Sequence, residues 1–138
     1  MTSSVTSPPL YARARRVGDL LFVSGQLPIN DAGLLYPGQV GADITLEQAQ
    51  EAAALAVQNC LAVVRDTLGS LDAVKGVARL GGYVATGEGF SNAPAVVDAA
   101  SQQILEALGE RGQHARLALG VASLPLGASV EIELAVQC

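Results

Sequence analysis

The stretch of sequence that decides the fold covers residues 114–136 and reads HARLALGVASLPLGASVEIELAV. On each side of its central Pro/Gly loop, apolar residues recur at every second position, which is the spacing of β-strands. We therefore predict one strand over residues 116–122 and another over residues 130–136. In the second strand, aliphatic side chains form one face, and Glu131 and Glu133 lie on the other.

The alternation also assigns the charged residues of these strands to one face of the sheet. In the first strand the leucines point one way, and Arg116 points the other way together with small residues. We expect the aliphatic faces to cover helices, which leaves Arg116, Glu131 and Glu133 together on the open face. An open, half-apolar sheet face on a domain this small also indicates a subunit interface.

A guanidinium and a carboxylate on one face of a sheet are the fewest groups that could hold a small carboxylate substrate and activate water. Arginine can hold a small carboxylate through two parallel hydrogen bonds, and a partly buried glutamate can carry protons because its pKa rises. The alternative for Arg116 is an ion pair with Glu131 or Glu133, and the two glutamates can equally face solvent. Composition favours that alternative, whereas the small-residue face favours a binding role for the arginine.

Upstream of this stretch, two segments carry helix signals. Residues 45–48 read Thr-Leu-Glu-Gln, a capping box that predicts a helix start, and Gly69 predicts the helix end. Asn92 and Pro94 predict the start of a second helix, and Gly109 its end. The predicted buried stripes are Ala49, Ala53, Val57, Cys60, Val64 and Leu68 in the first helix, and Val97, Ala100, Ile104 and Leu108 in the second.

Three further strands complete the predicted fold. They cover residues 11–17, 20–24 and 74–85, and a Gly18-Asp19 turn joins the first two. Within the third strand, Gly81-Gly82 indicates a bulge or a close approach of another segment. The order strand, strand, helix, strand, helix, strand, strand predicts an α+β fold in which two helices pack on one face of a mixed sheet.

Length and charge restrict the kind of protein. The chain has 138 residues, from which we predict one domain over residues 10–138 behind a loose tail at 1–9. Its net charge is −5, from 8 basic and 13 acidic residues, and this disfavours nonspecific nucleic-acid binding. The N-terminal residues lack a signal pattern, and the chain lacks an apolar run of about 20 residues. We therefore predict a soluble cytoplasmic protein with no membrane partner.

Sequence motifs for metal, nucleotide and nucleophile sites are missing. The two cysteines form no CxxC pair, and the lone histidine, His114, fits a hydrogen-bonding loop residue better than a metal ligand. No glycine-rich nucleotide loop and no Ser-His-acid spacing occurs. Ser24 fits a turn hydroxyl at a strand end, and Tyr11 and Tyr83 fit packing and site roles equally.

Taken together, these segments resemble the Rid family, also called the YjgF or reactive-intermediate-deaminase family. The resemblance covers nearly the whole chain after residue 10. It rests on Tyr11, Gly18–Pro28, the helix with Gln48 and Asn59, Ala115-Arg116, Leu124-Pro125 and Val130–Glu133. It implies a chorismate-mutase-like α+β sandwich and a homotrimer with its sites at the subunit interfaces.

The resemblance also implies an activity and roles for individual residues. Family members with the full site hydrolyse 2-imino or enamine acids, such as 2-aminoacrylate, to 2-keto acids and ammonia, without a cofactor. By this resemblance Arg116 binds the substrate carboxylate and Glu131 activates water. Tyr11 and Ser24 would line the cleft.

The sequence departs from the family's usual pattern in the same region. The usual Arg-Ser-Cys reads Arg116-Leu117-Ala118 here, and Ala118 retains the backbone carbonyl that the cysteine position contributes. The helix asparagine of the cleft corresponds to Asp98, whose charge would repel an anionic substrate. We therefore predict an imine deaminase of a divergent subgroup. The alternatives are a non-catalytic trimeric carboxylate-binding or regulatory protein and, disfavoured by the acidic charge, an endoribonuclease.

Overall fold

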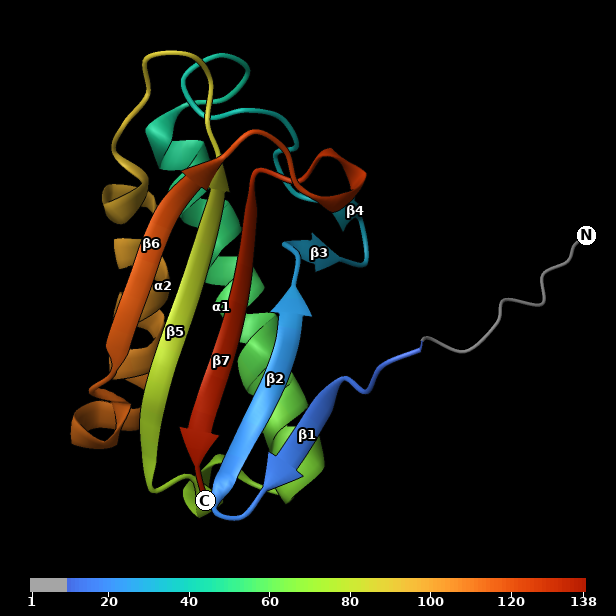
Figure 1. Ribbon diagram of the computed structural model, residues 1–138, viewed down its shortest axis with the longest axis vertical. Helices are drawn as coiled ribbons and strands as arrows, with labels where there is room; N and C mark the ends of the chain where they lie inside the picture. The colour runs from blue at the N-terminus through green and yellow to red at the C-terminus, as the bar shows by residue number, and fades with distance from the viewer. Residues whose placement is uncertain (1–9) are drawn as a thin grey trace, which may run out of the picture.

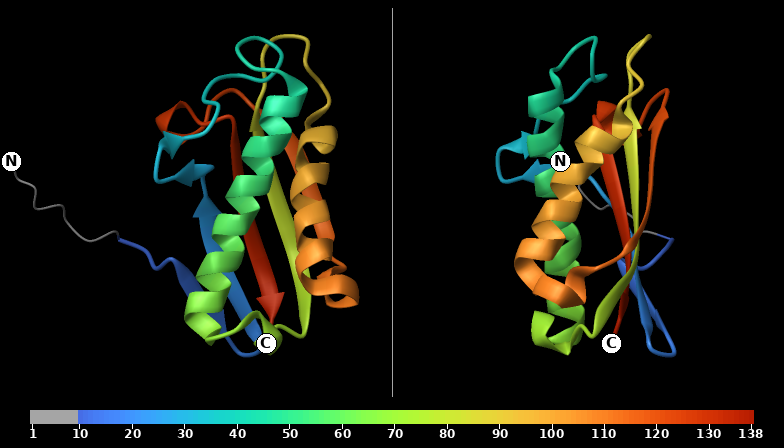
Figure 2. Two further views of the ribbon diagram at one scale, coloured as in Figure 1. Left: turned by 180° about the vertical axis from the view of Figure 1, so that it is seen from behind. Right: turned by 90° about the vertical axis from the view of Figure 1, so that its left-hand side faces the viewer.

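A computed structural model describes residues 10–138, so the predicted tail at 1–9 lies outside the described residues. Two helices cover one face of a five-stranded sheet, and the other face is open (Figures 1 and 2). The strand order is β1-β2-β7-β5-β6, with β5 and β6 parallel and the other neighbours antiparallel. This confirms the predicted α+β fold with a mixed sheet. The strands are β1 (Ala14–Val17), β2 (Leu20–Gln26), β5 (Gly76–Ala85), β6 (Ala115–Val121) and β7 (Val130–Gln137).

The two long helices begin and end at the predicted residues. Helix α1 (Leu46–Leu68) has the reciprocal capping box at Thr45, and Gly69 ends it in the left-handed conformation at φ 89°. Helix α2 (Ala93–Leu108) is capped by Asn92, whose side-chain oxygen accepts from the backbone N–H of Ala95, the third residue of the helix. The predicted stripes are buried, except that Leu68 is only partly buried.

The long loop after β2 is more ordered than its Pro/Gly content indicates. It contains a small hairpin of β3 (Ile29–Asn30) and β4 (Gly33–Leu34). Asn59 of α1 donates from its side chain to two carbonyls of this segment at 2.9 Å, which ties the hairpin to the helix. Short 3-10 helices complete the fold at Leu71–Ala73, Gly109–Gly112 and Pro125–Gly127.

The core lies between the two helices and the middle of the sheet. Strand β7 contributes the four aliphatic residues that the alternation assigns to the buried face, and all are at most 3% exposed. The predicted close approach is at Gly82, where a Cβ would stand 2.5 Å from a methyl group of Val97 on α2. The bulge in β5 lies earlier, between Val77 and Arg79.

The predicted facing of β6 is wrong. Arg116 is paired in register with the fully buried Leu80, so its side chain lies on the helix side of the sheet. Ala118 packs against the core from the same side, while Leu117 is 39% exposed on the open face. The alternation misleads because the open face is itself apolar at this edge, with Leu117 exposed, while Ala118 and Gly120 on the helix side are small. Arg116 therefore does not share a face with Glu131.

Among the helices of residues 10–138, none combines the length and the apolar character that crossing a membrane requires.

Candidate functional site

The first group of site residues lies on the open face, where β2 passes β7. Glu131 is half-buried there, and its carboxylate lies over the backbone of Gly25. A Cβ at position 25 would stand 2.6 Å from Glu131 Oε2, so a side chain at this position would displace the carboxylate. The neighbouring Ser24 lies within β2 and not at a turn. Its hydroxyl donates to the Ala12 carbonyl at 2.7 Å, which ties the segment after Tyr11 to this strand.

Glu131 differs from an ordinary surface carboxyl in its electrostatics. Burial raises its pKa, and the negative charge of Glu133 raises it further. Glu133 accepts hydrogen bonds from Arg79 Nη1 and from the Tyr83 hydroxyl, both at 2.9 Å. Glu133 thus has its own partners, and within residues 10–138 of one chain Arg116 pairs with Asp98 and not with either glutamate, which was the alternative to a binding role.

The second group lies at the edge strand β6, between the sheet and α2. Arg116 Nη1 contacts Asp98 Oδ1 at 2.7 Å and donates to the Ser101 hydroxyl at 3.3 Å. The Arg116 side chain is only 24% exposed, although the residue as a whole is exposed because its backbone lies at the sheet edge. Asp98 is 69% exposed. The guanidinium is therefore sheltered, while the carboxylate that pairs with it is open to solvent.

Sequence reasoning missed the partners behind this ion pair. The Ser101 hydroxyl lies 2.9 Å from His114 Nε2, and His114 Nδ1 lies 2.6 Å from the Gly112 carbonyl oxygen. No Ser-His-acid spacing in the sequence marks Ser101 and His114, because the two residues belong to different elements. A usable signal was present, since Ser101 follows Asp98 by three residues on one helix face and His114 precedes Arg116 by two.

The predicted site residues thus form two separate half-sites in one chain. The first half-site consists of Ser24 and Glu131, on the β2–β7 side of the sheet, and Tyr11, which precedes β1, is 72% exposed. The second half-site consists of Asp98, Arg116 and Ala118, at the β6 edge. Strand β5 lies between β6 and β7 in the sheet (Figure 1). The strand registers place the side chains of Arg116 and Glu131 on opposite faces of the sheet.

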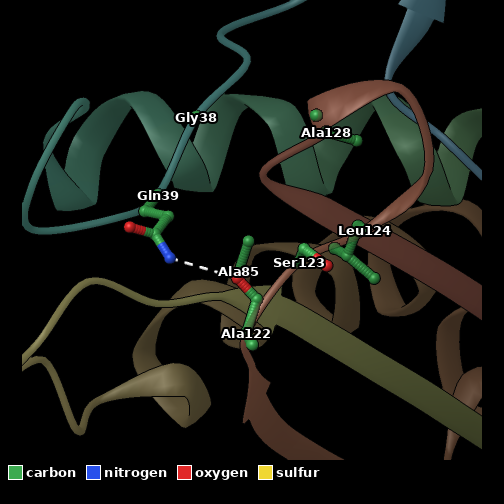
Figure 3. A pocket seen from close by; sticks show the side chains of 8 residues that line it. Gly38, Gln39, Ala85, Ala122, Ser123, Leu124 and Ala128 are labelled. Carbon is green, nitrogen blue, oxygen red and sulfur yellow. Dashed lines mark hydrogen bonds between the residues drawn. The ribbon is translucent and has the colours of Figure 1, made fainter.

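A hollow of about 210 Å³ opens elsewhere, where the ends of β5 and β6 meet the loop before β7 (Figure 3). Gln39 closes one side of it by donating to the Ala122 carbonyl at 3.1 Å. Small and apolar residues line most of the rest, and none of the predicted site residues reaches it. Within residues 10–138, no three His, Cys, Asp or Glu side chains gather as a metal site would require.

Comparison with known proteins places this geometry in a family. Residues 7–136 match the family described as "YjgF/chorismate_mutase-like, putative endoribonuclease". Protein TCP17 of Trypanosoma cruzi is 42% identical over 121 residues, which are 87% of this chain and 76% of that protein.

Solved structures agree with this assignment at two levels of similarity. Protein Atu1372 of Agrobacterium tumefaciens, described as of unknown function, superposes with a TM-score of 0.91 at 42% identity, over 96% of this chain and 85% of that one. A "putative endoribonuclease" of Shewanella oneidensis superposes with a TM-score of 0.92 at 31% identity, over 99% of this chain and 91% of that one. RidA from an Antarctic Psychrobacter superposes with a TM-score of 0.65 at 25% identity, over 96% of this chain and 92% of that one.

Proposed function

The chain belongs to the YjgF/chorismate mutase-like family, and from that premise we propose that it hydrolyses small 2-imino or 2-enamino acids to 2-keto acids and ammonia. The observation that carries the proposal is the environment of Glu131. This carboxyl is half-buried over an open glycine backbone, and its pKa is raised by burial and by Glu133. A base of this kind can accept a proton from water and return it to a leaving amine.

The reaction requires one anchor and one proton carrier. Arg116 holds the carboxylate of the substrate, as the family resemblance implies, with the planar fork that suits a carboxylate. Water adds to the carbon of the protonated imine while Glu131 takes a proton from the water, and this gives a neutral carbinolamine. Glu131 then gives that proton to the nitrogen. The C–N bond breaks as Glu131 takes the hydroxyl proton, and the keto acid and ammonia leave; the ammonia carries off that proton as ammonium. The backbone at Ala118 would accept from the nitrogen or the water.

Two copies of the chain are needed to complete the site. In one chain the two half-sites lie on opposite faces of the sheet, so Arg116 and Glu131 cannot act on one small molecule. Strand β6 is an edge strand, and the open face exposes Phe22 to 47% and Leu117 to 39%. Covering these apolar side chains with a neighbour in a homotrimer would place the β6 edge of one subunit against the open face of the next.

In the single chain the Asp98 carboxylate pairs with the Arg116 guanidinium, so the carboxylate of a substrate has to displace Asp98. Exposed ion pairs of this kind contribute only about 0.2–1 kcal/mol, and Asp98 is mostly open to solvent. The exchange of the Asp98 carboxylate for that of a substrate therefore costs little free energy. The same pair favours the second candidate function, a non-catalytic carboxylate-binding or regulatory trimer, if Asp98 excludes substrates that need the full guanidinium.

Imine hydrolysis by the purified protein tests the proposal. An amino-acid oxidase generates the imine in situ, semicarbazide competes for it, and keto-acid release is followed for wild type, Arg116→Ala and the matched control Arg65→Ala. Arg65 is an exposed arginine in the last turn of α1, a helix that carries neither of the two half-sites. Acceleration by wild type and Arg65→Ala but not by Arg116→Ala is expected. Saturable binding of 2-ketobutyrate without any acceleration would instead establish the binding protein, and cleavage of RNA the endoribonuclease.

A further inference from the structure

Behind the Arg116–Asp98 pair runs a chain of hydrogen bonds whose directions are fixed when the His114 ring is neutral. The Gly112 carbonyl can only accept, so His114 Nδ1 carries a proton and donates to it. In the neutral ring Nε2 is then an acceptor, and the Ser101 hydroxyl donates to it. The Ser101 oxygen, its proton directed to the imidazole, accepts from Arg116 Nη1.

From this geometry we propose that Ser101 and His114 are positioning residues, which hold the Arg116 guanidinium in place while Asp98 is exchanged for the carboxylate of a ligand. The inference deepens the proposed function and rests on it for the identity of the ligand. It assigns a role to the lone histidine of the chain, which the proposed reaction does not otherwise use.

The two contacts of the guanidinium differ in how firmly they are held. Asp98 is 69% exposed, and solvent screens its pair with Arg116. Ser101 lies one helical turn further along α2, is half-buried, and is fixed from behind by the imidazole. When a ligand carboxylate replaces Asp98, the contact to Ser101 can persist. The arginine then stays aimed at the ligand and does not return to its many free rotamers.

Ser101 and His114 do not have the surroundings that a serine nucleophile and its base require. Ser101 lies in the interior of α2, where backbone N–H groups donate to carbonyls within the helix, so the helix offers no oxyanion site beside the hydroxyl. A serine held between an imidazole and a guanidinium in this way acts through the arginine.

Nitrogen NMR gives a readout that does not depend on turnover. His114 is the only histidine, so its ring nitrogens are assigned without ambiguity, and the order of Arg116 is followed by relaxation of its Nε–H group. Ser101→Ala removes the link, Ser101→Thr keeps a hydroxyl, and the exposed Ser91→Ala is the matched control. The probe ligand is 2-ketobutyrate, with affinity measured by calorimetry.

We expect the Nδ1-protonated form in the free wild type and a shift of Nε2 on adding 2-ketobutyrate. In Ser101→Ala, Arg116 should lose order, the Nε2 shift should vanish and the Kd should rise about tenfold, as for loss of a bond to a charged group. Ser101→Thr should restore all three. An equally ordered Arg116 in Ser101→Ala overturns the positioning role whether or not a ligand binds. A different result would overturn the proposed function and leave the positioning role in place. In that case wild type neither binds 2-ketobutyrate nor accelerates imine hydrolysis, although Ser101→Ala still disorders Arg116.

Discussion

The carboxylate of Glu131 lies directly over the backbone of Gly25, so close that a Cβ at position 25 would stand 2.6 Å from its Oε2. Two strands that are distant in sequence thus bring a base against an open stretch of backbone. The glycine at this point of β2 leaves room for the carboxylate, where a β-strand would otherwise favour a branched or aromatic residue.

Gly25→Ala should displace Glu131 and reduce turnover while leaving the fold intact. A displacement of about 1 Å in a reacting group can reduce the rate roughly 100-fold, so we expect a loss of that order in kcat. The matched control is Gly76→Ala, where a Cβ would meet only the end of a flexible glutamine side chain at 3.4 Å. Steady-state kinetics with thermal unfolding checks this. Equal kcat for the two variants would show that Glu131 is not held where the reaction needs it.

Glu133→Gln should move the acid limb of the pH–rate profile to lower pH. Glu131 acts as a base, so activity rises as pH increases through its pKa, and the charge of Glu133 raises that pKa. Removing the charge lowers the pKa, whereas burial, the larger cause, still keeps it above the ordinary value. The neutral glutamine can still accept from Arg79 and Tyr83. The profile of kcat/KM is measured beside Glu110→Gln, an exposed control, and an acid limb that stays in place or moves up contradicts the assignment.

Asp98→Asn should strengthen the capture of carboxylate ligands by Arg116. The asparagine competes less well for the guanidinium, and an exposed ion pair of this kind limits the gain to about two- to fivefold in KM or Kd. Asp66→Asn, exposed on α1, is the control. A rise in KM would mean that the Asp98 carboxylate binds the nitrogen of the substrate and does not merely compete with the substrate for Arg116.

Mixed oligomers should recover activity that neither parent has. If each site takes Arg116 from one subunit and Glu131 from the next, Arg116→Ala and Glu131→Gln are each inactive. In random mixtures of equal amounts, about a quarter of the sites are intact, because each of the two donors is correct half of the time. Co-refolding the two variants and assaying imine hydrolysis measures this fraction. Absence of recovery in mixtures shown to exchange subunits would place both residues in one chain's site.

The local signals along the chain were reliable predictors. The capping box at Thr45, the stop at Gly69 and the cap at Asn92 lie where the structure has them, because each depends on hydrogen bonds within a few residues. The alternation in β7 also predicted its buried face, since the central strand has helices on one side and charged groups on the other.

The same reasoning gave the wrong face for β6, because an edge strand beside an apolar open face has no clear polar side. The links of Arg116 to Asp98 and of Ser101 to His114 join different elements, and periodicity within an element carries no information about them. The sequence by itself determined the elements, their order and the residue types available for chemistry, all of which follow from local backbone and burial preferences. Only the tertiary structure decided that Arg116 and Glu131 lie on opposite faces of the sheet, because strand pairing and helix packing, which join distant residues, set the direction of each side chain.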